Sequence, residues 1–242
     1  MARQSASETH ESSGDAIGAS QRTQLTPVPA AKTRRGAQTR RRLVEAAATV
    51  FSEYGYSAAR IADMVRMAGI SHGNFYRHFP GKDEVLLAVL EEPLAELRRA
   101  SSREPDPVHR SGPDLVELIR ANTNYFAAYA RQRHLFRVMR EAAAVNPEFA
   151  RLWLSVRQGF VGRTAHWLAA LVEAGQLEGG LDVELLAETL GSMMEHLAYV
   201  QIGLPAELPR PETIDALGRV TGESWYLILT GRSRLGATDR GR

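Results

Sequence analysis

The chain has 242 residues, of which 44% are hydrophobic, and its formal net charge is +2. This length suits one moderate domain or a small domain joined to a larger one, and the apolar share can fill a core. No apolar run approaches the roughly 18 residues that span a bilayer, the first 20 residues lack the apolar segment of a secretory signal, and the absence of cysteine excludes disulfides and thiolate zinc sites. We therefore expect a cytoplasmic protein.

The small net charge conceals an uneven distribution. Residues 32–82 hold ten Lys or Arg against three acidic side chains, whereas residues 83–242 hold 18 basic and 22 acidic ones. Six of the basic residues, and no acidic one, lie between Lys32 and Arg42. A basic segment followed by a mildly acidic remainder indicates a head that binds a polyanion, attached to a body with a different task.

In chain order, the first segment, residues 1–35, is rich in Ser, Thr, Gln, Ala and Pro. It cannot bury enough apolar surface to offset chain entropy, so we predict a disordered tail that ends in basic residues. A helix follows and is predicted to end at Gly55. Its apolar residues recur at helical spacing and form one stripe, consisting of Leu43, Val44, Ala47, Val50, Phe51 and Tyr54.

Residues 60–79 predict two short helices joined by a tight turn at Ala68-Gly69-Ile70. Gly69 permits the left-handed backbone that the turn requires. Ser71 is placed to cap the second helix by accepting a hydrogen bond from the amide of Gly73 or Asn74. The side chains predicted to face inward are Ile61, Met64 and Val65 in the first short helix, and Ile70, Phe75 and Phe79 around the second.

The outward face of the second short helix has the composition of a surface that reads the DNA major groove. Asn pairs bidentately with adenine, glycine permits close approach, and Tyr, His and Lys reach phosphate oxygens. The arginines at 40–42 would alone indicate a solvated helix face, and those at 34–35 either enter the minor groove as an arm or are simply disordered. The predicted DNA-binding residues are Arg34, Arg35, Thr39, Arg40, Arg41, Arg60, Ser71, His72, Gly73, Asn74, Tyr76, Arg77, His78 and Lys82.

Residues 36–96 resemble the N-terminal domain of TetR-family transcriptional regulators, whose pattern includes A-G-V-S-x-G-x-x-Y-x-x-F-x-x-K-x-x-L. The matching residues are Ala68-Gly69-Ile70-Ser71, Gly73, Tyr76, Phe79, Lys82 and Val85-Leu86. There are two departures. Ala59 stands where the family usually has a Thr that caps the second helix and touches phosphate, a contact that Arg60 replaces in our interpretation. Met64-Val65 stands where the family usually has Ile-Ala, shortly before the A-G-V-S segment, and this difference changes only core packing.

Beyond this segment the pattern stays helical, without alternating β-branched runs, so we predict an all-α fold. A helix from near Gly81 past Leu97 should kink or break at Pro93. A loop spans residues 101–114, and further helices are expected at about 114–130, 132–144, 147–174, 182–203 and 210–230. The predicted parts are a helix-turn-helix domain at 36–96, an effector-binding and dimerisation domain at 97–231 and a loose tail at 232–242. Start signals are Asn146-Pro147 and Asp182.

The resemblance implies that the C-terminal helices form a ligand pocket and a homodimer interface. Aromatic and Met side chains recur at helical spacing, a pattern that more often belongs to a plain core than to a ligand site. The polar groups beside them add support for an apolar pocket that binds a hydrophobic effector. The last two helices carry apolar stripes wide enough for a four-helix bundle across a two-fold axis. The predicted effector-binding residues are Asn122, Phe126, Met139, Trp153, Trp167, Met193, Glu195 and His196.

Two alternatives compete with a DNA-binding regulator. The sequence contains no G-x-G-x-x-G, P-loop or H-E-x-x-H, and its seven His are scattered, so we expect neither an enzyme nor a metal or cofactor site. A ligand-binding sensor that has lost sequence-specific DNA recognition is the second alternative. We favour a homodimeric repressor that binds an inverted-repeat operator in double-stranded DNA, is released by a small hydrophobic effector and does not associate with a membrane.

Overall fold

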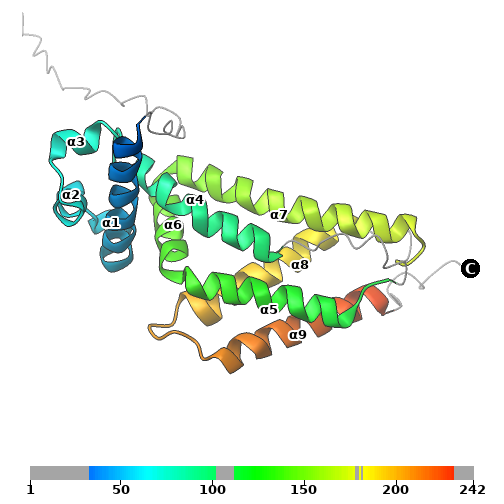
Figure 1. The fold of residues 1–242 in the computed structure, drawn as a ribbon. Coiled ribbons are helices and arrows are strands. Elements are labelled where there is room, and N and C mark those ends of the chain that lie inside the picture. Colours follow the sequence, from blue (N-terminus) through cyan, green and yellow to red (C-terminus); the bar gives the residue numbers. More distant parts are fainter. Residues whose placement is uncertain (1–32, 102–111, 178–179, 181, 232–242) are drawn as a thin grey trace, which may run out of the picture.

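The computed structural model describes residues 33–101, 112–177, 180 and 182–231 (Figure 1). Within these ranges every regular element is helical, as predicted. The predicted tails at 1–32 and 232–242, and most of the predicted loop at 101–114, lie outside the described residues. The elements are α1 (Arg34–Ala58), α2 (Ile61–Ala68), α3 (His72–Tyr76), α4 (Lys82–Ser101), α5 (Leu115–Arg131), α6 (Arg133–Val145), α7 (Pro147–Glu173), α8 (Val183–Ala198), the π-helical turn η1 (Tyr199–Gly203) and α9 (Pro211–Thr230).

The helices form a small head and an elongated body. Helices α1, α2 and α3 lie together at one end, and α4 leads from them into the body (Figure 1). Helices α5, α7, α8 and α9 run along the body, whereas α6 crosses between them and the head. The short helix α3 therefore sits at the far tip of the molecule, away from the long helices.

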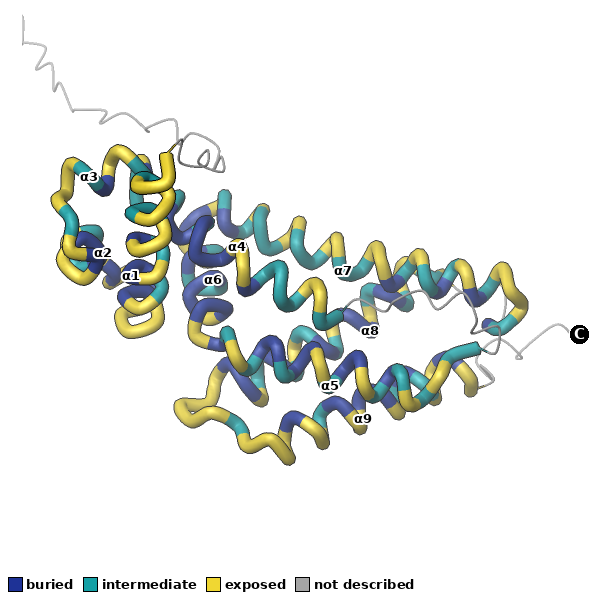
Figure 2. The backbone as a smooth tube through the Cα atoms, in the orientation of Figure 1, coloured by how far each residue is buried: buried dark blue, intermediate teal, exposed yellow. Residues whose placement is uncertain are grey.

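The head does not have a core of its own. Its buried residues, among them Phe51 and Phe75, belong to one apolar cluster with Val138 and Met139 of α6 and Phe149 of α7. A second cluster fills the body between α5, α7, α8 and α9. Figure 2 shows buried backbone running from the head through α4 and α6. The first cluster thus joins the head to the body through direct packing.

The local start and stop signals read from the sequence are confirmed. Asn146 caps α7, with Pro147 in its first turn, and Asp182 caps α8 through the amide of Leu185. Helix α1 begins at Arg34, two residues before the predicted segment boundary, and Thr33 caps it. The predicted break at Pro93 is absent, because α4 continues through this buried residue to Ser101.

The end of α1 is shaped by Gly55. Its backbone (φ 74°, ψ −176°) interrupts the helix, which confirms the predicted stop, and one further turn continues to Ala58. The carboxylate of Glu141, on α6, accepts hydrogen bonds from the amides of Tyr56 at 2.8 Å and Ser57 at 2.9 Å. Tyr54, predicted to be part of the buried stripe, is 53% exposed, so that assignment is wrong: the stripe leaves the core one turn before the helix ends.

A second polar contact ties the head to α7. The hydroxyl of Tyr56 donates to one oxygen of Asp83 at 2.6 Å, and the side-chain amide of Asn146 donates to the other at 2.9 Å. Asn146 is buried, and its own carbonyl oxygen accepts from the amide of Glu148. One side chain thereby caps α7 and connects it to α4 and α1.

Helix α9 packs closely against α5 because two glycines face it. A Cβ on Gly218 would lie 2.7 Å from the Cα of Thr123, and one on Gly222 would lie 2.7 Å from the Cα of Ile119. Both glycines thus allow a close approach between two helices of the same chain. Exposed apolar side chains remain on the last two long helices, namely Leu185, Val220, Leu227 and Ile228.

The segment between η1 and α9 is fixed by a buried arginine. The guanidinium of Arg133, at the start of α6, donates to the carbonyls of Pro205 at 3.0 Å, Ala206 at 2.6 Å and Glu207 at 2.6 Å. Arg133 is only 4% exposed. Carbonyl oxygens at the end of η1 thus take the place of a carboxylate partner for this charge.

Candidate nucleic-acid interface

Helix α3 is held by the turn before it and by two aromatic anchors. Gly69 has a left-handed backbone (φ 63°), and the hydroxyl of Ser71 accepts from the amide of Asn74 at 3.2 Å, as predicted. The rings of Phe75 and Phe79 are fully buried, with centroids 6.1 Å apart. Because its inner face is fixed in this way, α3 presents its opposite face to solvent.

The outward face of α3 consists of the residues that the sequence predicts. No atom lies within 4 Å of where a Cβ on Gly73 would stand, so the surface is open there. The ring of Tyr76 is 57% exposed and rests edge-on against Phe75, with centroids 5.4 Å apart. The exposed residues are His72, Gly73, Tyr76 and Arg77, and Asn74 and His78 are partly exposed.

The arginines of α1 have distinct positions. Arg40 lies over the ring of Phe79, with its guanidinium carbon 4.9 Å from the ring centroid. Arg42, which the sequence did not single out, donates to the carbonyl of Ala68 and so ties α1 to the helix-turn-helix turn. Arg41 faces solvent, with only an exposed 3.7 Å ion pair to Glu45. Arg41 is therefore the member of this run best placed to reach a phosphate.

The first turn of α1 adds further polar groups. Arg34 and Arg35 are exposed and helical, and the hydroxyl of Thr39 donates to the carbonyl of Arg35 at 3.0 Å. Both arginines thus begin a rigid helix, whereas the sequence placed them in a tail. Their exposed positions are compatible with contacts to the DNA backbone.

His78 is predicted from the sequence to contact phosphate. Burial lowers the pKa of its imidazole, and the neighbouring charges of Arg77 and Arg40 lower it further. The neutral form of the ring is therefore favoured, and in that form it can offer a hydrogen bond but no positive charge.

The capping position of α2 is Arg60, so the assignment of the family's capping Thr to the position of Ala59 is wrong by one residue. Ala59 is buried, and the following residue, Arg60, occupies the N-cap of α2 without any side-chain hydrogen bond to the helix. Helix α2 thus lacks the cap that a Thr would provide. Arg60 itself is exposed, which leaves its guanidinium accessible.

Lys82 is engaged at the base of the head. Its ammonium donates to the backbone carbonyl of Tyr56 at 2.8 Å and lies 4.4 Å from the centroid of the Tyr56 ring. The sequence assigned this lysine only to phosphate. In the structure Lys82 binds the end of α1, and a contact with phosphate would have to be made in addition to this hydrogen bond.

The turn Gly69-Ile70-Ser71-His72-Gly73 also fits the letters of the G-x-S-x-G nucleophile pattern. In hydrolases such a serine sits on a sharp turn between a strand and a helix. Here it connects two helices, and the Ser71 hydroxyl is used as a helix cap. The geometry is that of a helix-turn-helix.

Comparisons with known proteins agree with this geometry over both halves of the chain. Residues 43–89 match the family model of bacterial regulatory proteins of the tetR family, and residues 118–226 match the C-terminal domain of the transcriptional regulator EthR. The chain is 31% identical over 198 residues to the probable HTH-type transcriptional regulator ArpR of Pseudomonas putida, covering 78% of this chain and 88% of the relative. The chain belongs to the TetR family of transcriptional regulators.

Other relatives of this TetR-family regulator carry similar names. The HTH-type transcriptional regulator TtgR of Pseudomonas putida is 31% identical over 78% of this chain and 88% of the relative. EthR of Mycolicibacterium smegmatis is 29% identical over 63% of this chain and 71% of the relative. These proteins are DNA-binding regulators and not enzymes, and such regulators are generally repressors.

Solved structures show the same fold. GusR of Salmonella enterica superposes with a TM-score of 0.64 at 17% identity, covering 80% of this chain and 96% of that chain. The fatty acid degradation regulator FadR of Bacillus halodurans gives a TM-score of 0.62 at 20% identity, covering 81% and 96%.

The predicted effector-binding residues with apolar side chains are divided between the two apolar clusters. Asn122 is buried and donates to the hydroxyl of Thr221 on α9 at 3.2 Å. Phe126 is fully buried in the body cluster, and Trp167 and Met193 pack against that cluster. Met139 is fully buried in the cluster of the head, and Trp153 packs against it. Glu195 is partly buried, and His196 is exposed.

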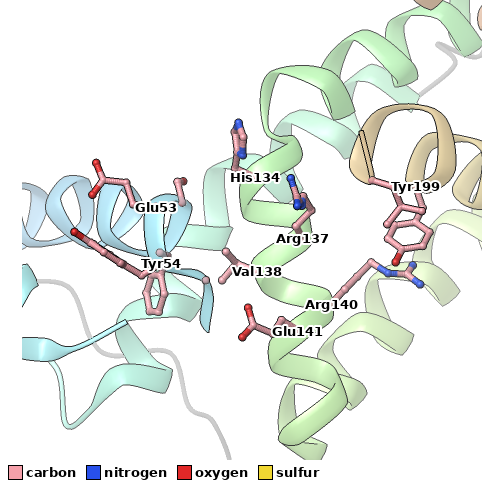
Figure 3. Close-up of a pocket in the computed structure, with 12 residues that line it drawn as sticks. Glu53, Tyr54, His134, Arg137, Val138, Arg140, Glu141 and Tyr199 are labelled. Atoms are coloured by element: carbon pink, nitrogen blue, oxygen red, sulfur yellow. The ribbon is translucent and has the colours of Figure 1, made fainter. Parts of the chain in front are cut away.

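Two clefts are present in the described part of the chain. One, of about 850 Å³, lies between the end of α1, α6 and η1 (Figure 3). The other, of about 460 Å³, lies between α7 and the start of α8. None of the eight predicted effector-binding residues lines either cleft, because spacing along one helix does not reveal which helices face each other.

None of the described helices combines the length and the apolar character that a membrane-crossing helix needs.

Proposed function

We propose that this regulator is a sequence-specific repressor that binds an inverted-repeat operator as a homodimer and is released by a small hydrophobic effector. The observation that carries the proposal is the outward face of α3. It is capped by Ser71, anchored by Phe75 and Phe79, and open at Gly73 and Asn74.

The basic groups around α3 support the proposal. Arg41 and Arg60 are exposed on neighbouring helices and have the reach for phosphate oxygens, which set the register on the duplex. Asn74 and Arg77 lie on α3 or directly after it, where side chains can meet base edges. Base reading and phosphate binding would thus come from different helices of one head.

The homodimer is supported by apolar surface that the chain leaves uncovered. Leu185 on α8 and Val220 and Leu227 on α9 are each more than half exposed. A two-fold axis that covers them would pair two heads, and recognition helices roughly 34–36 Å apart meet successive major grooves. The operator would then be an inverted repeat.

Release by an effector requires only that the effector favours a different head spacing. The hydrophobic character of the effector is proposed from the aromatic composition of the body, whose side chains Phe126, Tyr129 and Trp225 are packed in its core in this structure. A coupling free energy of about 1–3 kcal/mol would change DNA affinity by roughly 5- to 150-fold. The competing function, a sensor without sequence-specific DNA recognition, has one observation in its favour, the missing side-chain cap at Arg60.

The deciding experiment is selection of bound sequences from random duplex DNA by the purified protein at about 150 mM salt. We expect one inverted repeat. If protein refolded free of ligand also recovers nothing better than random sequence, the regulator has lost DNA recognition and the proposal is wrong.

Two substitutions then assign the contacts on the selected operator. Asn74→Ala should cost roughly 1–3 kcal/mol and relax preference at one base position. Arg41→Ala should weaken specific and random DNA alike and flatten the salt dependence. Arg99→Ala, which removes an exposed arginine of α4, is the matched control and should change neither. Equal losses on both DNAs from Asn74→Ala would refute its assignment to a base.

A further inference from the structure

The larger cleft lies where the head meets the body, apart from the α3 face. Helix α6 forms its floor, the end of α1 forms one wall, and η1 with Leu204 forms the other (Figure 3). Its volume of about 850 Å³ falls within the range of small-molecule sites.

Two guanidinium groups on the floor are incompletely paired. Arg140 lies over the ring of Tyr199, with its guanidinium carbon 3.9 Å from the centroid. Its ion pair with Glu195 measures 3.7 Å, which is too long for a hydrogen bond. Arg137, one turn away, is exposed and makes no hydrogen bond or ion pair with any other residue that the structure describes. Both can still bind an anion.

The carboxylate on the same floor is already occupied. Both oxygens of Glu141 accept hydrogen bonds from the amides of Tyr56 and Ser57. The other acidic residue of the cleft, Glu53, is exposed and belongs to the wall formed by α1, whereas Arg140 points toward η1 (Figure 3). Glu195 lies near Arg140 but is also paired with Arg157 at 3.0 Å, so Arg137 is the charge of this floor without an acidic partner among the described residues.

The walls of the cleft expose apolar side chains. Tyr54 on α1 is 53% exposed, and Leu204 after η1 is 51% exposed. Val138 lies on the floor between them. A ligand with a flat apolar body would remove these side chains from water, which favours binding.

We propose that this cleft binds a small organic anion with one carboxylate on an aromatic body. The carboxylate contacts Arg137 and Arg140, and the aromatic body packs against Tyr54 and Leu204. The site differs in place and in chemistry from the hydrophobic effector site of the proposed function, and it does not depend on that function.

The position of the cleft links its occupancy to the head. Two consecutive residues of α6 contact the body and the head. Arg140 contacts Tyr199 in the body, and Glu141 accepts hydrogen bonds from the end of α1 in the head. A ligand that contacts α1 and α6 together binds most tightly to one relative position of head and body. The ligand shifts the equilibrium between the positions of the head by as much as its affinities for those positions differ.

The test is isothermal titration calorimetry of the full chain, without DNA, using 2-naphthoate and its neutral analogue 2-naphthamide. We expect naphthoate to bind about tenfold more tightly, which corresponds to about 1.4 kcal/mol. Arg137→Gln should remove about that factor for naphthoate and leave naphthamide unchanged. Arg99→Gln on α4, outside the cleft, is the control and should bind both like the wild type. Leu204→Ala should weaken both compounds.

The proposal is overturned if naphthoate fails to bind at millimolar concentration, or if the acid and the amide bind equally. Naphthoate binding that survives Arg137→Gln unchanged also overturns it, because the compound then occupies another part of the body. Arg137 is exposed, so its replacement should leave folding intact, and a far-ultraviolet circular dichroism spectrum checks this. A failed operator selection would leave this binding result standing, so the two proposals fail separately.

Discussion

Replacing Gly55 by alanine tests how the head is attached to the body. The glycine has φ 74° and ψ −176°, a region that is essentially restricted to glycine. A Cβ at this position would lie 2.6 Å from one carboxylate oxygen of Glu141. That oxygen accepts the hydrogen bond from the Tyr56 amide. The substitution therefore strains the backbone and displaces the carboxylate together.

The loss of folding stability can be estimated from these two effects. Backbone strain of this kind costs about 1–3 kcal/mol. Displacing the carboxylate weakens two hydrogen bonds to backbone amides, and because the site is partly exposed we assign them about 1–2 kcal/mol together. The sum, about 2–5 kcal/mol, corresponds to a fall in Tm of roughly 4–20 °C for a chain of this size.

The assay is thermal and urea unfolding at pH 7, with Gly162→Ala as the matched control. Gly162 is helical and has no atom within 4 Å of an added Cβ, so alanine there should stabilise by about 0.5–1 kcal/mol. In a Glu141→Ala background the steric conflict disappears, and Gly55→Ala should then cost only the backbone part, about 1–3 kcal/mol. The reasoning is refuted if Gly55→Ala is as stable as the wild type, or if its cost is the same in both backgrounds.

Three further predictions concern packing, pH and the buried arginine. Gly218→Ala should lower the free energy of unfolding by about 1–3 kcal/mol in urea titrations, because α9 must move away from the backbone of α5; a gain in stability would show that the helices are not so close. Burial acts to raise the pKa of Glu141, but the amide of Ser57 and other partners outweigh it and lower the pKa. The stability that this group supplies is therefore complete above its unfolded pKa of about 4.3 and is lost as the pH falls through the lower folded value. The stability gap between wild type and Glu141→Gln should thus be constant above about pH 5 and narrow as the pH falls below about 4.3, and a gap that stays constant in acid would contradict this. Arg133→Met should destabilise by about 2–4 kcal/mol and speed proteolysis near residue 206, because the carbonyls of Pro205 and Ala206 lose the charged donor that holds this segment; unchanged proteolysis would argue against the contact.

Features encoded by neighbouring residues could be read from the sequence. Helix starts could be predicted at Ser71, Asn146 and Asp182, because an N-cap needs only a side chain and a backbone amide two or three residues further on. Gly55 and Gly69 announce helix ends for a similar local reason. The boundaries of the body helices and the outward face of α3 follow from the same signals.

Features that join distant segments could not be read in this way. The bond between Tyr56 and Glu141 spans 85 positions, and neither residue has a pattern that points to the other. Arg42 looks like one more basic residue until the turn at Ala68 is placed beside it. Helical spacing likewise did not show that Phe126 and Met139, both predicted to bind an effector, belong to different clusters.

The shared core of head and α6 limits how far this protein can be treated as interchangeable parts. A fragment that ends after α4 would leave Phe51 and its neighbours without Val138, Met139 and Phe149, and would expose the apolar surface that these residues cover. A chimera that transplants only the helix-turn-helix onto another regulator would create the same mismatch. Exchange of DNA specificity within the family should therefore graft the outward side chains of α3 alone, or move the facing surface of α6 together with the head.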